Sequence, residues 1–158
     1  MSELNFLRWV QGRLNNSSSD ILVDSGDDAA VVRVGNRSVL LKTDAVLDGV
    51  HFRLEKAKPE AIGHKAMGRP LSDIAAMGGR PTFAVVAMAL PRRIPKSKLE
   101  GIFRGMNKTA KRFGVSIVGG DLSSHRGKLS ITVSMMGEIS SGKPVLRGGA
   151  KEGDRILV

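Results

Sequence analysis

The chain has 158 residues, of which 41% are hydrophobic and 25% charged, the size and composition of one globular domain. It has no cysteine, which excludes disulfides, thiolate metal sites and cysteine nucleophiles and fits a reducing cytosol. The net charge of +10 raises a nucleic-acid hypothesis, but the basic residues are scattered without interleaved aromatics. That pattern favours a solvated basic face or attraction of a phosphorylated small molecule.

The first part of the chain predicts a helix, a loop and a hairpin. Apolar residues recur at helical spacing over residues 3–14, which predicts a short amphipathic helix. The polar side chains in this stretch are unlike a secretory segment. Asn15–Ser19 has the composition of a loop. The β-rich runs Ala29–Val34 and Ser38–Thr43 are separated by three turn-forming residues, so we expect a hairpin.

The middle of the chain predicts a helix followed by a buried strand. Residues 59–77 have a helical pattern that begins at Pro59, and we expect Pro70 to break or kink it. The continuous apolar run Thr82–Leu90 predicts a strand buried on both faces. No apolar stretch approaches the roughly 18 residues that a membrane span needs, so we expect a cytoplasmic protein with no membrane partner.

The last part of the chain predicts a second long helix and three strands. Apolar residues recur at helical spacing over Ser97–Phe113, and Gly114 is a suitable stop. Val115–Val118 and Leu129–Ile139 have strand patterns, and a further strand starts at 154–158, as if the domain were part of a longer protein. The whole order predicts an α/β or α+β fold with helices on one face of a mixed sheet.

Four aspartates lie at conspicuous positions for so basic a chain. Two follow glycines, one ends an apolar run and one lies among small apolar residues: Asp27, Asp121, Asp44 and Asp73. Carboxylates gathered at one end of a sheet repel each other unless a cation lies between them, and magnesium prefers such oxygen ligands while bridging to nucleotide phosphates. Each aspartate taken alone is better explained as a turn or N-cap residue. The residues themselves therefore leave a metal–phosphate site as one hypothesis.

Five blocks of sequence occur in the order and spacing of a known family. They are Gly26–Val31, Thr43-Asp44 with Asp48–Phe52, Ser72–Gly78, Gly119–Asp121 and Leu146–Asp154. Together they resemble the thiamine-monophosphate kinases, whose superfamily includes aminoimidazole ribonucleotide synthetase, selenophosphate synthetase and a hydrogenase maturation protein. His51-Phe52 and the absence of a cysteine nucleophile indicate the thiamine branch.

The resemblance implies transfer of the γ-phosphoryl group of ATP to thiamine monophosphate, with magnesium ions holding the nucleotide phosphates. No covalent catalytic residue is implied, because positioning and charge neutralisation supply most of the catalysis in phosphoryl transfer. The positions that match metal contacts are Asp27, Lys42, Thr43, Asp44, Asp73 and Asp121. Those that match ATP contacts are Phe103, Gly120, Asp121 and Arg147, and His51 matches a substrate contact.

The resemblance also implies an architecture. Residues 1–158 correspond to a single N-terminal domain that binds ATP and magnesium, and the C-terminal domain of the family is absent from this sequence. The fold expected is that of the N-terminal domain of aminoimidazole ribonucleotide synthetase. Its sheet is expected to pair with that of a second subunit into a barrel, which makes a homodimer the expected state.

Four positions depart from the family pattern. Lys42 stands where a small hydroxyl residue is common, Asp48 where glutamate is common, Pro70 where asparagine is usual, and Phe103 where tyrosine is frequent. These departures leave open a related superfamily enzyme that uses ATP on another small substrate. The net charge leaves open a basic nucleic-acid-binding module, the least favoured of the three readings.

Overall fold

The computed structural model describes residues 2–14, 16–139 and 142–155. Along the chain the elements are α1 (Glu3–Gln11), β1 (Ile21–Val23), β2 (Ala30–Val34), β3 (Arg37–Leu47), α2 (Pro59–Ala76), β4 (Arg80–Pro91), α3 (Lys96–Arg112), β5 (Ser116–His125) and β6 (Ser130–Glu138). The strands form one sheet in the order β1-β2-β3-β6-β4-β5. β4 and β5 pair in parallel, and the other neighbours pair antiparallel.

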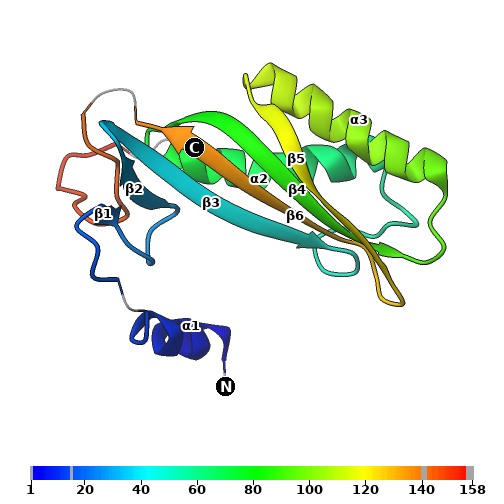
Figure 1. Ribbon diagram of the computed structural model, residues 1–158, viewed down its shortest axis with the longest axis horizontal. Coiled ribbons are helices and arrows are strands. Elements are labelled where there is room, and N and C mark those ends of the chain that lie inside the picture. Colours follow the sequence, from blue (N-terminus) through cyan, green and yellow to red (C-terminus); the bar gives the residue numbers. More distant parts are fainter. Residues whose placement is uncertain (1, 15, 140–141, 156–158) are drawn as a thin grey trace.

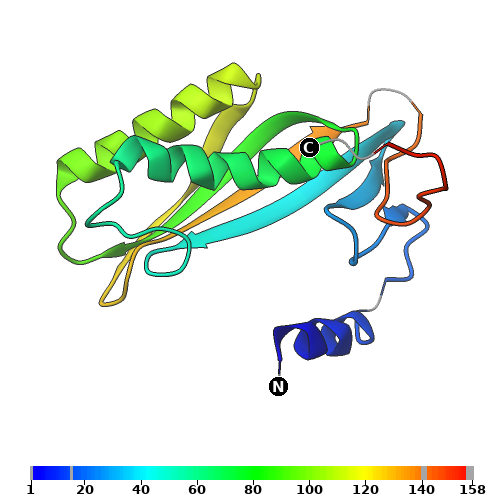
Figure 2. The same ribbon diagram turned by 180° about the vertical axis from the view of Figure 1, so that it is seen from behind.

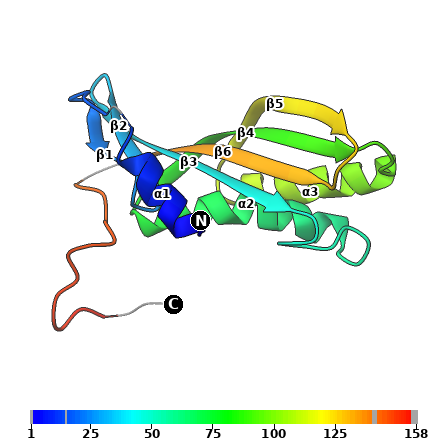
Figure 3. The ribbon, with the colours of Figure 1, turned by 90° about the horizontal axis from the view of Figure 1, so that it is seen from below.

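Helices α2 and α3 lie side by side on one face of the sheet, as Figures 1 and 2 show from opposite sides. Figure 3 shows the sheet above this helical layer, with its other face bare in the described part of the chain. The predicted α/β class, with helices on one face of a mixed sheet, is confirmed. The hairpin is confirmed as well: β2 and β3 are joined at Gly35, whose φ of +59° suits the tight turn.

Helix α2 runs unbroken through Pro70, so the expected break is wrong. A proline inside a helix removes one hydrogen bond and crowds the preceding turn, at a cost of about 3 kcal/mol. Met67, Leu71 and Ile74, on either side of Pro70, are buried in the core. Burial of each such side chain contributes about 1.5–3 kcal/mol, which offsets the cost of the proline.

Strand β4 is buried on one face only, so the expectation of burial on both faces is wrong. Ala84 and Val86 face the helices and are buried, whereas Phe83 and Val85 are 47% and 42% exposed. The run is apolar throughout because both faces of the strand carry apolar side chains. The described chain supplies a helical layer for one of those faces.

The second helix of the layer ends as expected, but the strand after it is longer than expected. Gly114 follows α3 with a φ of +68°. β5 then continues through Gly119–Asp121 to His125, so these residues lie within the strand rather than after it. Of the strand expected at 154–158, residues 154 and 155 form no strand, and the remainder lies outside the described residues.

The two helices approach each other closely through glycines. A Cβ atom on Gly63 of α2 would lie 2.0 Å from the carbonyl oxygen of Ile102, and one on Gly105 of α3 would lie 2.1 Å from the carbonyl oxygen of Glu60. The helices can pack at this distance only because neither glycine carries a side chain. Their inner faces and the sheet form one buried core, which includes Leu40, Met67, Ile102 and Ile131.

Helix α1 lies apart from the sheet and its two covering helices (Figure 1). It buries none of its side chains. Its aromatic residues contact each other instead, with the Phe6 and Trp9 rings stacked at 5.9 Å and the Arg13 guanidinium 4.1 Å from the Trp9 ring centre. Among the described residues, no helix is long and apolar enough to cross a bilayer.

Candidate phosphate- and cation-binding site

Two charged pairs connect β3 to α2. Lys42 and Asp44 are two residues apart on one strand, so both side chains point to the helical face of the sheet. Arg69 and Asp73 are four residues apart on α2 and share one face of that helix. The Lys42 Nζ atom lies 2.6 Å from Asp73 Oδ2 and 3.8 Å from Asp44 Oδ2, and an Arg69 Nη2 atom lies 3.2 Å from Asp44 Oδ1. We call these four residues the Lys42 cluster.

Asp27 and Asp28 contact Arg147 in a second charged group. The Arg147 backbone N–H donates to both carboxylate oxygens of Asp27, at 3.3 Å each. Its guanidinium donates to Asp28 Oδ1 at 2.5 and 3.2 Å. The hydrogen bond from Asp28 raises the pKa of Arg147, and the charges of Asp28, Asp27 and Asp73 raise it further. The charge of Asp73 thus acts on both groups.

Met77 holds this second group against the end of α2. Its sulfur accepts a hydrogen bond of 3.0 Å from the Ala29 N–H, and its carbonyl oxygen accepts one of 3.1 Å from the Val145 N–H. The Met77 side chain is fully buried. The loop that carries Asp27 and the segment that carries Arg147 are therefore both fixed at the helix end nearest Asp73.

A hollow of about 690 Å³ between α3 and β5 brings together Phe103, Gly120 and Asp121. Phe103 is 54% exposed. Gly120 has a φ of +155°, and a Cβ atom there would lie 1.8 Å from the Val86 carbonyl oxygen, so only glycine fits. Ser123 Oγ donates to Asp121 Oδ2 at 2.9 Å. Three of the four residues expected to contact ATP therefore line one hollow.

The predicted metal-binding residues do not converge on one point. Asp121 pairs with Ala87, which pairs with Thr132, which pairs with Ala45. Three strand spacings separate β5 from β3, or about 14 Å. Among the described residues, no three acidic or histidine side chains are placed to hold one metal ion. A ligand that contacts both Asp121 and the Lys42 cluster must therefore span several strands.

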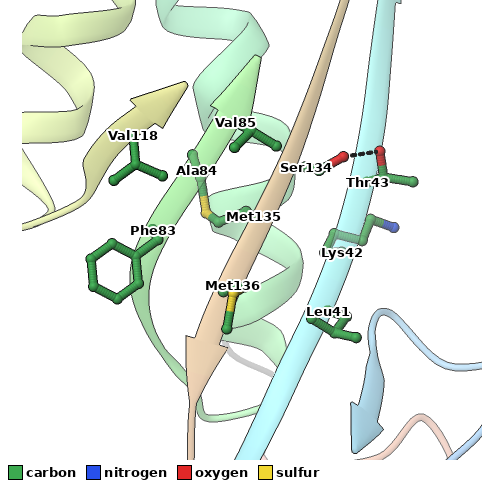
Figure 4. Close-up of a pocket in the computed structure, with 10 residues that line it drawn as sticks. All are labelled: Leu41, Lys42, Thr43, Phe83, Ala84, Val85, Val118, Ser134, Met135 and Met136. Carbon is green, nitrogen blue, oxygen red and sulfur yellow. Dashed lines mark hydrogen bonds between the residues drawn. The ribbon is translucent and has the colours of Figure 1, made fainter. Parts of the chain in front are cut away.

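Thr43 points away from the Lys42 cluster, to the bare face of the sheet. Its hydroxyl lies 2.9 Å from that of Ser134 on β6, as the dashed line in Figure 4 shows. These hydroxyls border a hollow of about 310 Å³ on the bare face. The rest of its lining is mainly apolar, with exposed side chains from four strands: Leu41, Phe83, Val85, Val118 and Met136.

His51 lies in the turn after β3, and the last residue of that strand, Leu47, is about 16 Å along the strand from Lys42. The His51 Nδ1 atom accepts a hydrogen bond of 3.1 Å from the Leu47 N–H. Its carbonyl oxygen accepts one of 2.7 Å from Lys65 Nζ. Asp48 stabilises the same turn by accepting a hydrogen bond from the Leu54 N–H. The turn therefore fixes the orientation of the His51 ring.

The family of the chain is shown by a match between most of its residues and a known domain. Residues 26–139 match the family model described as AIR synthase related protein, N-terminal domain. The chain belongs to this AIR synthase family. The chain is 37% identical over its full length to the thiamine-monophosphate kinase of Bacillus subtilis, of which it covers 49%. It is 40% identical over 99% of its length to that of Rhodopirellula baltica, of which it covers 51%.

Solved structures confirm the AIR synthase N-terminal fold. A structure described as AaThiL complexed with AMPPCP and TMP superposes on 94% of the chain with a TM-score of 0.83 and 32% identity, over 45% of its own length. The resemblance to thiamine-monophosphate kinases, expected from the sequence blocks, is therefore confirmed. The chain spans about half the length of the curated relatives it matches.

Within this AIR synthase domain, the ion pairs of the Lys42 cluster are what sequence reasoning missed. The Arg69 side chain is 43% exposed, yet it contacts Asp44. The available signal was the spacing: a cation and an acid two apart on a strand, and another such pair four apart on the next helix.

Asp27 and Asp121 each offer a carboxylate, the ligand type that magnesium prefers, and neither is contacted by an ammonium group; their partners are an N–H and an O–H donor. The pair Asp44 and Asp73 does not fit a divalent ion in the same way. An ammonium group already lies within contact distance of both carboxylates.

Proposed function

We propose that this chain is the N-terminal domain of an ATP-dependent thiamine-monophosphate kinase, residues 1–158, which acts together with a second domain. The enzyme is a transferase in thiamine biosynthesis that converts thiamine phosphate and ATP to thiamine diphosphate and ADP. The observation that carries the proposal is the match of the whole chain to the Bacillus subtilis kinase at 37% identity. The similar structure with AMPPCP and TMP supports ATP and thiamine monophosphate as the two substrates.

In this proposal ATP binds the hollow between α3 and β5. The exposed Phe103 ring offers an apolar surface for the base, and the absence of a side chain at Gly120 lets a ligand approach the backbone. Arg147, the fourth residue proposed to contact ATP, lies outside this hollow and is paired with Asp28. Magnesium, when bound, would neutralise the phosphate charge. Of the six positions that match metal contacts, Asp27 and Asp121 are the proposed ligands, because Lys42 contacts both Asp44 and Asp73 and Thr43 points to the bare face of the sheet.

His51 is proposed to bind the thiamine phosphate. Because Nδ1 accepts from the Leu47 N–H, the neutral ring carries its proton on Nε2. That N–H is a suitable donor to a phosphate oxygen. The turn held by Asp48 and Lys65 keeps the donor in a fixed direction.

We further propose a cytoplasmic homodimer in which the bare sheet faces of two subunits pair. Support comes from the exposed apolar side chains gathered on that face. A related enzyme that acts on another small substrate is the nearest alternative, and a panel of phosphorylated substrates offered to the two-domain protein distinguishes it.

The first test is calorimetric titration of the chain with a non-hydrolysable ATP analogue, with and without magnesium. We expect binding that requires the metal. Asp121→Asn should weaken it at least tenfold, because it removes a carboxylate proposed to hold the magnesium ion, whereas the exposed control Glu152→Gln should bind like the wild type. Polynucleotide binding that falls steeply with salt, without any nucleotide binding, would instead favour the nucleic-acid module.

A further inference from the structure

The Lys42 ammonium occupies the position between two carboxylates from different elements. Its Nζ atom contacts Asp73 of α2 at 2.6 Å and lies 3.8 Å from Asp44 of β3. The Lys42 side chain is 22% exposed, and those of Asp44 and Asp73 are 14% and 27% exposed. These charges are largely withdrawn from water, so they interact more strongly than an ion pair on the open surface.

The charge balance of the Lys42 cluster is complete without a metal ion. Asp44 and Asp73 carry two negative charges, and Lys42 and Arg69 carry two positive charges. A divalent ion bound between two carboxylates has the same net charge of zero. Asp44 is contacted on Oδ2 by Lys42 Nζ and on Oδ1 by the Arg69 guanidinium, so a metal ion between Asp44 Oδ2 and Asp73 Oδ2 would have to displace Lys42.

The backbone holds Lys42 in this position. Lys42 pairs with Met135 of β6 in the middle of the sheet, and the preceding residue, Leu41, pairs with Ala30 of β2. Strand alternation then directs the side chain to the helical face, where α2 presents Asp73. The contact follows from the register of the sheet and from the packing of α2 on it.

We propose that Lys42 is a resident cation that takes the place of one divalent ion between Asp44 and Asp73. The inference rests on the proposed function and narrows its metal set. The chain binds no divalent metal at this pair, and the metal ions that accompany ATP bind at other carboxylates. Removal of the ammonium opens a divalent site.

The test is titration with Mn²⁺ alone, followed by electron paramagnetic resonance, on the chain and its variants. Lys42→Ser should gain one Mn²⁺ site, with an affinity at least tenfold higher than that of any Mn²⁺ site in the wild type. Lys42→Ser with Asp73→Asn should lose the gained site. Lys42→Arg keeps the charge, and Lys56→Ser removes a lysine from the exposed turn before α2; both should bind Mn²⁺ as the wild type does.

Thermal unfolding supplies a second readout, which remains informative if the Lys42→Ser variant is unstable without metal. Magnesium should raise the Tm of this variant by at least about 3 °C and leave those of the wild type and Lys56→Ser unchanged. The inference is overturned if Lys42→Ser shows wild-type Mn²⁺ binding and no magnesium-dependent rise in Tm. Failure of the wild type to bind the ATP analogue would instead reject the proposed function, since the Mn²⁺ titration contains no nucleotide.

Discussion

At the scale of single residues, Gly120 of β5 is a position where the neighbouring strand leaves no room for a side chain. Gly120→Ala would place a Cβ atom 1.8 Å from the Val86 carbonyl oxygen at a φ of +155°. We expect a loss of roughly 2–4 kcal/mol in the free energy of unfolding, from overlap and backbone strain together. Urea unfolding measures this change.

The neighbouring glycine provides the control for that prediction. A Cβ atom on Gly119 meets nothing within 4 Å, so Gly119→Ala should change the free energy of unfolding by less than about 1 kcal/mol. Equal urea midpoints for the two variants would show that β5 shifts to accept the extra methyl group.

Single residues also show where sequence reasoning stopped. The family pattern identified Lys42 as a departure, but its contact with Asp73 depends on how α2 lies across β3, which no local pattern encodes. Asp27 and Arg147 were both expected near phosphate, and their contact bridges 120 residues. The residue types were predictable from sequence, whereas their pairing required the tertiary structure.

At the scale of elements, the contact between α2 and α3 depends on glycines that leave no room for a side chain. Gly63→Ala would place a Cβ atom 2.0 Å from the Ile102 carbonyl oxygen and 2.7 Å from the Met106 nitrogen. Because both are backbone atoms, the helices must separate, and we expect a loss of at least about 2 kcal/mol. Thermal unfolding and urea titration measure the loss.

Gly68 provides the matched control on the same helix. A Cβ atom there meets nothing within 4 Å, so Gly68→Ala should stabilise the protein by about 0.5–1 kcal/mol through helix propensity alone. If both variants were stabilised, the close approach of α2 and α3 would not be a constraint on the fold.

The elements differ in how far local patterns predicted them. The long helices and the hairpin were predicted because their periodicity and turn residues are local signals. β1 has three residues, too few to show alternation. β5 was predicted to stop at Val118 because glycines usually end a strand, yet pairing with β4 carries it on to His125. Pairing with a neighbour thus overrode a weak local preference.

At the scale of the whole molecule, the proposed homodimer depends on the bare sheet face. Val85 lies in the middle of this face and is 42% exposed, whereas Val50 is 73% exposed in a turn. Val85→Lys should convert the proposed homodimer to monomer, because a lysine in the middle of an apolar interface would be desolvated without a partner. Sedimentation velocity over a concentration series measures the association.

The control at this scale is Val50→Lys, which makes the same change away from the sheet and should leave the dimer intact. A wild type that sediments as a monomer at all concentrations, or a dimer unaffected by Val85→Lys, would contradict association through the sheet. The apolar run of β4 had indicated burial on both faces, and an interface between subunits would account for the face that α2 and α3 leave bare.

The contact of Arg147 with Asp27 and Asp28 also has a thermodynamic consequence. The segment 142–147 rests on the body of the protein through Val145 and Arg147, and the second of these contacts involves the Asp27 carboxylate itself. The proposed binding of a cation at Asp27 would therefore be thermodynamically linked to docking of the segment. Whatever factor the cation imposes on docking, docking imposes on the affinity for the cation, so the segment reports on the state of that carboxylate.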